Sequence, residues 1–197
     1  GRTVYFPKTV AGYKVSEAIN LPANTSIDAE EGAFIDGTGA ITGYSSTANG
    51  LIYSAGSGLG ASLGGGLSAA INKGDKSIDF TSLVVGVVAG DMVCLRNTAD
   101  KSWAKHRAYY RQGEFAIVKS VLDKTMTLHA SAIDSYSDLS TCEVNLVGTT
   151  TNYIRNLTIK GNNADLKNYA AIRIQYGRGI VIENVEIDES SSSGIVV

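Results

Sequence analysis

Three carboxylic acids lie close together near the end of the 197-residue sequence: Glu183, Glu186 and Asp188. Hydrolysis of a glycosidic bond ordinarily uses two such groups on either side of the bond, roughly 5 to 10 Å apart depending on the stereochemistry. Cleavage of a sugar polymer by elimination instead needs a base and a group that neutralises a uronate carboxylate. These three residues are therefore the candidate catalytic residues, and their use depends on the elements that position them.

The segment that carries these acids nearly repeats an earlier segment. Residues 153–160 (YIRNLTIK) align with residues 181–188 (VIENVEID) at an offset of 28 residues, and residues 171–174 (AIRI) align with residues 194–197 (GIVV) at an offset of 23. Short β-branched strands that recur at such a period are typical of a solenoid, in which parallel strands stack in successive rungs. The predicted fold class is therefore all-β, a right-handed parallel β-helix.

Apolar and polar residues alternate within each repeat, so one face of each strand is expected to fill a core while the other faces water. The expected core residues are Ile154, Leu157, Ile159, Ile172, Ile174, Ile182, Val185 and Ile187. This alternation places the three carboxylic acids on the outer face of the solenoid.

Two cationic residues are expected beside these acids. The offset of 28 residues places Arg155 beside Glu183 and Lys160 beside Asp188, one rung apart at about 4.8 Å. Such pairs stabilise an exposed strand by about 0.2–1 kcal/mol, and the cations hold the carboxylates in the ionised state. Three interpretations of this face remain open: a solvated ladder of ion pairs, a surface that contacts substrate, and a catalytic pair.

Asn156 and Asn184 occupy corresponding positions in the two long repeats. Asn tolerates the left-handed backbone conformation that a tight corner requires. Stacked Asn side chains can also form hydrogen bonds from one rung to the next. We therefore expect a corner between two short strands at each Asn.

A second group of residues has the composition of a sugar-binding surface. Residues 101–111 (KSWAKHRAYYR) hold the only Trp of the chain, two Tyr and four Lys or Arg residues. Aromatic rings contact the apolar faces of sugars and Arg pairs with carboxylates, so an acidic polysaccharide could bind here. A subunit or domain interface has the same composition, and an ordinary loop is the third interpretation. Together with the cations of the rungs, the candidate substrate-binding residues are Trp103, Arg107, Tyr109, Tyr110, Arg155, Lys160 and Arg173.

Composition argues against several other classes of protein. Hydrophobic residues make up 44% of the chain, which is enough for a sizeable core. The net charge of −2 argues against nucleic acid as a partner, and no apolar run approaches the roughly 18 residues of a membrane span. Cys94 and Cys142 lack metal-ligand spacing and are predicted to be buried thiols of a protein made in a reducing compartment. We expect neither a metal nor a cofactor.

The strand pattern changes along the chain, and this change predicts the domain organisation. Residues 1–55 are predicted to form the first rungs, and the Gly-rich residues 56–69 a flexible connector. Residues 70–149 lack the solenoid period and contain a hairpin signal, so we expect an inserted small antiparallel β-barrel or sandwich. Residues 150–197 continue the solenoid. Because no terminal cap is visible at Val197, we expect a longer protein whose active site lies beyond this residue.

Specific segments carry a family resemblance. Residues 4–7 (VYFP), Gly12-Tyr13 and residues 21–24 (LPAN) look like the start of a β-helix. Residues 73–78 (KGDKSI), 89–93 (AGDMV), 111–115 (RQGEF) and 118–128 look like a small β module inserted into it, and residues 156–159 (NLTI) like the point where the solenoid resumes. Together these segments resemble the pectin-lyase-like β-helix proteins of bacteriophage tailspikes and capsule depolymerases.

The resemblance implies the N-terminal part of a phage tailspike that binds a bacterial capsule or lipopolysaccharide and degrades it by hydrolysis or β-elimination. It also implies a homotrimeric fibre in the virion tail, with tail or baseplate proteins as partners, acting outside the cell at the host surface. Two alternatives remain: a secreted bacterial enzyme similar to pectate lyase, and a non-enzymatic β-helical adhesin or fibre. The few cysteines and the lack of a signal peptide at Gly1 favour the virion protein over the secreted enzyme. Fold alone does not decide whether the protein is an enzyme.

Overall fold

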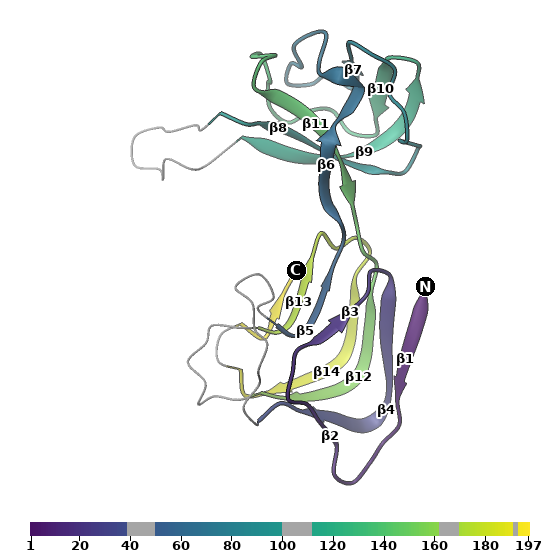
Figure 1. Cartoon of the computed structure of the whole chain (residues 1–197), viewed down its shortest axis with the longest axis vertical. Coiled ribbons are helices and arrows are strands. Elements are labelled where there is room, and N and C mark those ends of the chain that lie inside the picture. Colours follow the sequence, from purple (N-terminus) through teal and green to yellow (C-terminus); the bar gives the residue numbers. More distant parts are fainter. Residues whose placement is uncertain (39–49, 100–111, 162–169, 191–192) are drawn as a thin grey trace. The chain divides into compact units, whose positions relative to one another are not determined.

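The computed structural model describes residues 1–38, 50–99, 112–161, 170–190 and 193–197, and in these residues the chain is all-β apart from one short 3-10 turn. The chain divides into two compact units (Figure 1). Unit 1 consists of residues 1–58 and 149–197, and unit 2 of residues 59–148. Each unit has its own hydrophobic core, and no buried residue belongs to both cores.

Unit 1 contains two sheets, and every strand pair described within them is parallel. The first, called here the long sheet, has the order β1-β4-β12-β14, with β2 beside β4; its strands are β1 (Arg2–Phe6), β2 (Tyr13–Lys14), β4 (Thr25–Asp36), β12 (Tyr153–Lys160) and β14 (Val181–Asp188). The second, the short sheet, has the order β15-β13-β5-β3; its strands are β3 (Ile19–Leu21), β5 (Gly50–Ala55), β13 (Ala170–Gln175) and β15 (Ile195–Val196).

The chain passes alternately between these two sheets from β12 to β15 (Figure 1). The register of the long sheet places Ile154 opposite Ile182 and Ile159 opposite Ile187, which confirms the predicted offset of 28 residues. In the short sheet Ile172 lies opposite Ile195, which confirms the offset of 23 residues. Each repeat therefore adds one strand to each sheet.

The core of unit 1 lies between strands of both sheets and confirms the predicted facing. Ile154, Leu157, Ile159, Ile172 and Ile174 are buried. The corresponding side chains of β14 are half-buried and pack against this core: Ile182, Val185 and Ile187. They are less buried because, among the strands that the structure describes, β14 pairs only with β12.

The Asn corners of the long sheet have the predicted conformation. Asn156 and Asn184 have φ angles of 58° and 50°, in the left-handed region that Asn tolerates. Asn184 Nδ2 donates a hydrogen bond of 3.1 Å to Asn156 Oδ1, from β14 to β12. Asn156 Nδ2 in turn lies 3.4 Å from Asp28 Oδ1 of β4, so the side-chain ladder extends over three strands.

Unit 2 contains a six-stranded sheet with the order β6-β11-β8-β9-β10-β7. Its elements are β6 (Gly58–Ser62), η1 (Leu63–Gly65), β7 (Ser77–Asp79), β8 (Met92–Asn97), β9 (Gly113–Leu122), β10 (Thr125–Leu128) and β11 (Cys142–Gly148). The pairs β7–β10, β9–β10, β8–β9 and β8–β11 are antiparallel, as expected for this part of the chain. The predicted hairpin turn is present at Asp123, whose φ is 52°.

The Gly-rich segment 56–69 differs from the predicted flexible connector. Within it, β6 pairs with β11, η1 follows, and Leu67 is buried in the core of unit 2. Glycine weakens a strand in isolation, but pairing with β11 supplies the hydrogen bonds that keep β6 extended. Cys94 and Cys142 are buried thiols, as predicted.

No helix in the described ranges of the chain is both long enough and apolar enough to cross a membrane.

Candidate functional site

The outer face of the long sheet presents polar side chains in rows that cross the strands. Parallel pairing sets these rows, because residues in register lie directly beside one another on the same face. The row nearest the start of β12 contains Thr3, Ser26 and Tyr153, and the next row contains Tyr5, Asp28, Arg155 and Glu183. Beyond the Asn corner lie a row of Phe34, Thr158 and Glu186 and a row of Lys14, Asp36, Lys160 and Asp188.

Arg155 lies between carboxylates of the two neighbouring strands, Asp28 on β4 and Glu183 on β14. Its Nε is 3.4 Å from Glu183 Oε2, which confirms the predicted proximity of this pair. The contact has the distance of an ion pair but not the geometry of a hydrogen bond. Nε is therefore buried without a hydrogen-bond partner. The guanidinium carbon also lies 5.4 Å from the centre of the Tyr153 ring, a cation–π distance.

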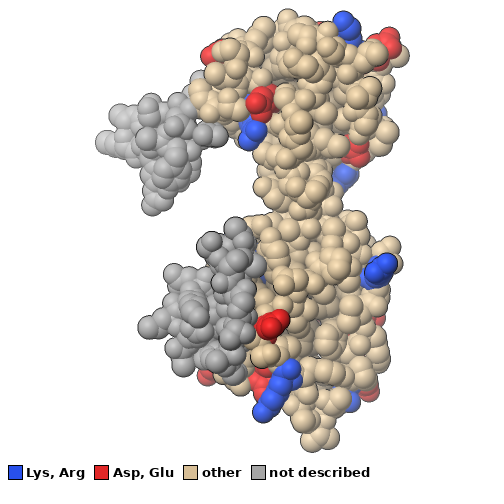
Figure 2. Space-filling view, viewed as in Figure 1, with Lys and Arg blue, Asp and Glu red and all other residues tan. Residues whose placement is uncertain are grey.

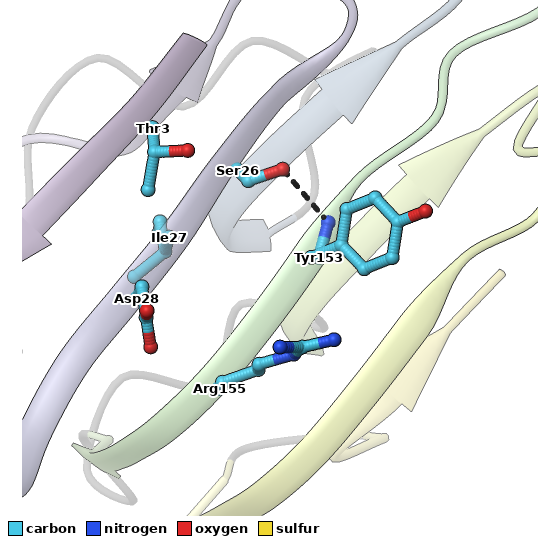
Figure 3. Close-up of a pocket in the computed structure, with 6 residues that line it drawn as sticks. All are labelled: Thr3, Ser26, Ile27, Asp28, Tyr153 and Arg155. Carbon is cyan, nitrogen blue, oxygen red and sulfur yellow. Dashed lines mark hydrogen bonds between the residues drawn. The ribbon is translucent and has the colours of Figure 1, made fainter. Parts of the chain in front are cut away.

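A hollow of about 290 Å³ opens on this face, lined by Thr3, Ser26, Ile27, Asp28, Tyr153 and Arg155. We call it the Tyr153 hollow. Figure 3 shows its hydroxyl groups on the β1 and β4 strands and the Tyr153 ring and Arg155 side chain extending from β12. The backbone N–H of Tyr153 donates a hydrogen bond of 3.2 Å to Ser26 Oγ, which ties β12 to β4 at the floor of the hollow. The hollow thus brings together an aromatic ring, a guanidinium, a carboxylate and two hydroxyls.

A larger hollow, of about 750 Å³, lies at the Asn corner. It is lined by Glu31, Gly32, Asn156, Leu157, Thr158, Asn184, Val185 and Glu186. The register of the two strands explains this hollow. Between two matched pairs, β12 has the single residue Asn156, whereas β4 has the four residues Ala29–Gly32, so β4 bulges at the corner. Carboxylates from β4 and β14 therefore line one polar depression, with Thr158 Oγ1 3.5 Å from Glu186 Oε2.

Lys160 lies opposite Asp188 as predicted, but the expected ion pair between them is absent from the described contacts. The Lys160 ammonium lies 4.4 Å from the centre of the Phe34 ring instead. The prediction missed this partner because the 28-residue repeat contains no counterpart of Phe34, which lies on β4. Lys160 also lies opposite Asp36, whose pKa is lowered first by its hydrogen bonds to Thr38 and then by the nearby charges of Lys14 and Lys160.

The three candidate catalytic acids are all exposed, but the structure does not gather them in one hollow. Glu183 pairs with Arg155, Glu186 lines the corner hollow, and Asp188 lies in the row of Lys160. They occupy three successive rows along a single strand.

The remaining predicted binding residues are divided among different surfaces. Arg155 and Lys160 face outward on the long sheet, whereas Arg173 lies on the short sheet beside Tyr53 and Val196. Four further predicted residues, Trp103, Arg107, Tyr109 and Tyr110, lie outside the described residues. Among the residues that are described, no cluster of His, Cys, Asp and Glu is arranged to hold a metal ion.

Sequence reasoning missed the residues that complete the Tyr153 hollow. Tyr153 lies in the repeat, but its repeat partner is Val181, so its side chain gave no periodic signal. Ser26 and Asp28 come from β4, which pairs with β12 across the whole inserted unit. The one available signal was the period-2 alternation of polar and apolar residues in 25–29 (TSIDA).

Comparison with known proteins finds one matching domain family and several similar solved structures. Residues 60–147 match the family of tailspike protein-like, Ig-like domains. The fold is similar to the tailspike gp61 of Pseudomonas phage phi297, with a TM-score of 0.77, 21% identity and 94% of this chain covered. It is also similar to the Gp54 tailspike of Acinetobacter baumannii bacteriophage AP22, solved in complex with A. baumannii capsular saccharide, with a TM-score of 0.71, 19% identity and 94% coverage.

The tailspike protein gp49 of Pseudomonas phage LKA1 matches with a TM-score of 0.65, 20% identity and 98% of this chain covered. The chain spans 29%, 30% and 36% of these three proteins, in the order given. No curated protein sequence matches the chain. The family match thus covers the greater part of unit 2, and the structural matches show that the fold of nearly the whole chain is similar to that of three phage tailspike proteins.

Proposed function

We propose that this chain is part of a phage tailspike that binds a bacterial surface polysaccharide, either capsule or lipopolysaccharide, and degrades it. The observation that carries the proposal is the structural similarity over nearly the whole chain to tailspikes, one of which was solved with a capsular saccharide. The match of residues 60–147 to a tailspike domain family supports it independently. The protein would then act from the tail of the virion, at the surface of the host cell.

The architecture proposed for unit 1 is a right-handed parallel β-helix. Parallel pairing in both sheets and the alternation of the chain between them support this architecture. A thin solenoid exposes much surface, and association of three copies around its long axis would bury part of that surface. We therefore propose a homotrimer, which would also present each sugar-binding surface three times.

The chemistry of degradation is proposed on the outer face of the solenoid. Hydrolysis is supported by the carboxylates of Glu31 and Glu186, which line one hollow from different strands. A fibre that binds polysaccharide without cutting it is the second candidate. The ion pair of Arg155 with Glu183 favours that alternative, because this carboxylate already has a cationic partner on the neighbouring strand.

The test uses the full-length protein and a panel of purified capsular polysaccharides and lipopolysaccharides. Binding to at least one polymer, with a loss of polymer mass in size-exclusion chromatography, is the expected result. New reducing ends without unsaturated uronates would indicate hydrolysis, and unsaturated uronates would indicate elimination. Binding without a loss of mass would select the non-enzymatic fibre, and failure to bind any polymer would overturn the proposal.

A further inference from the structure

We propose that the Tyr153 hollow binds one sugar unit of a polysaccharide that is neutral or carries amino groups, in preference to a polymer of uronates. This inference rests on the proposed function, since it names the chemical class of the polymer and one place where it binds. The hollow lies entirely within unit 1, on strands β1, β4 and β12.

The aromatic ring supplies the apolar contact. Tyr153 is 41% exposed although its strand, β12, is paired on both sides, so a large part of its ring faces solvent. The guanidinium carbon of Arg155 lies 5.4 Å from the ring centre, a cation–π contact that favours this position of the ring. A preformed ring of this kind can bury the C–H face of a pyranose at little cost in side-chain entropy.

Polar groups of both kinds surround the ring. Thr3 and Ser26 contribute hydroxyls, which can donate and accept, and Asp28 contributes a carboxylate, which accepts. Arg155 contributes donors only; its Nε is buried, but its side chain lines the hollow and is 43% exposed. Sugar hydroxyls act as donors and acceptors at once, so they match this mixture of groups.

The charges around the hollow disfavour a strongly anionic ligand. Arg155 lies between Asp28 and Glu183, so two carboxylates compensate the single positive charge of the hollow. The five strands of the long sheet carry seven acidic and four basic residues. On the face drawn in Figure 2, the charged side chains of unit 1 are scattered and of both signs, without a basic patch. A chain of uronates would meet net repulsion here, whereas a neutral chain would not and an amino sugar would be attracted.

The experiment measures binding of oligosaccharide fragments by calorimetry to the full-length protein and to Tyr153→Ala. The fragments come from the panel of surface polysaccharides, sorted by composition into neutral, amino-bearing and uronate-bearing classes. Short fragments avoid the avidity of a multivalent assembly. Tyr176→Ala is the matched control, because Tyr176 is 42% exposed and lies outside the hollow. We expect the bound fragments to be neutral or amino-bearing, and Tyr153→Ala to weaken their binding about tenfold or more while the control does not.

The second measurement is the salt dependence of fragment binding, which a merely structural role of Tyr153 would not affect. Binding of a neutral fragment should be independent of ionic strength, and binding of an amino-bearing fragment should weaken as salt rises. Binding of a uronate fragment that Tyr153→Ala abolishes would overturn the charge argument. Binding that neither Tyr153→Ala nor Arg155→Met affects would overturn the assignment of the hollow, with the proposed function intact. If the wild-type protein binds no fragment and no intact polymer, the proposed function falls together with this inference.

Discussion

The two units of the chain differ in how far apart in the sequence their neighbouring strands lie. In unit 2, β9 and β10 pair across the two-residue turn Asp123-Lys124. In unit 1, the central pair of the long sheet is β4 with β12, and the hydrogen bond from Tyr153 to Ser26 joins residues 127 positions apart. Contacts of such separation are costly to form, because loop closure must precede them.

The outer face of the long sheet in unit 1 is therefore built from two segments that unit 2 separates in the sequence. The chain enters unit 2 through β6 and leaves it through β11, and these two strands are paired. The Tyr153 hollow takes Thr3, Ser26, Ile27 and Asp28 from the segment before unit 2, and Tyr153 and Arg155 from the segment after it.

The largest expected effect comes from cavities in the two separate cores. Ile154 in unit 1 and Leu95 in unit 2 are both fully buried. Replacing either by Ala should lower the free energy of unfolding by about 2–5 kcal/mol. Hydrogen exchange should show lower protection mainly in the unit that carries the substitution, because the cores share no residue. Equal loss of protection in both units after either substitution would show that the units do not unfold separately.

A smaller effect is expected from a buried polar group that joins the two halves of unit 1. Asn152 is fully buried; its amide donates to Thr25 O and to Ser54 Oγ, and its oxygen accepts from Thr150 Oγ1. Asn152→Ala would leave these groups buried without partners and should cost about 1–3 kcal/mol in urea unfolding. The exposed Asn20→Ala serves as the control and should change stability by less than about 0.5 kcal/mol.

Comparable stability of the Asn152 and Asn20 variants would mean that water enters and replaces the lost hydrogen bonds.

A still smaller effect on stability is expected from the side-chain hydrogen bond at one of two left-handed corners. Asn184 and Asp123 both have left-handed backbone angles, with φ of 50° and 52°. Of these two residues, only Asn184 has a described side-chain hydrogen bond, to Asn156 of β12. Glycine adopts this conformation freely, so Asp123→Gly should leave stability within about 0.5 kcal/mol, whereas Asn184→Gly should lose about 0.5–1.5 kcal/mol. Identical melting shifts for both glycine variants would show that the Asn ladder contributes nothing.

The smallest effect concerns the pKa of Asp36. Its carboxylate accepts hydrogen bonds from Thr38 Oγ1 at 2.6 Å and from Thr38 N at 3.0 Å, which lower the pKa from its ordinary value of 3.8. Because the folded-state pKa is depressed, its stabilising contribution is present above about pH 3.8 and is lost as the pH falls through the folded-state pKa. Thr38→Val should raise the pKa of Asp36 in an NMR titration. The stability difference from wild type should vanish at the acidic end of the titration.

An unchanged Asp36 pKa in Thr38→Val would assign the shift to the backbone hydrogen bond and to the neighbouring lysines instead.

The sequence predicted the parts of the fold that repeat locally. The register of β12 with β14, the inward side chains and the Asn corners all followed from the 28-residue repeat. The place of β4 did not follow, because its four-residue bulge at Ala29–Gly32 breaks the repeat. The role of β6 was missed because a Gly-rich sequence has low intrinsic strand propensity, and only its distant partner β11 makes it a strand.

The candidate site shows the same division. The proximity of Arg155 and Glu183 was predictable because both residues belong to the repeat. Asp28, Ser26 and Phe34 belong to β4, so the Tyr153 hollow and the contact of Lys160 with Phe34 required the three-dimensional structure.

The most direct test of the account is a crystal structure of the full-length protein with a bound oligosaccharide from the polymer that it recognises. We expect a sugar ring against Tyr153, with hydroxyls within hydrogen-bonding distance of Arg155 and Asp28 in the hollow of unit 1. Saccharide bound only to unit 2, or an unoccupied Tyr153 hollow in a saturated complex, would contradict it.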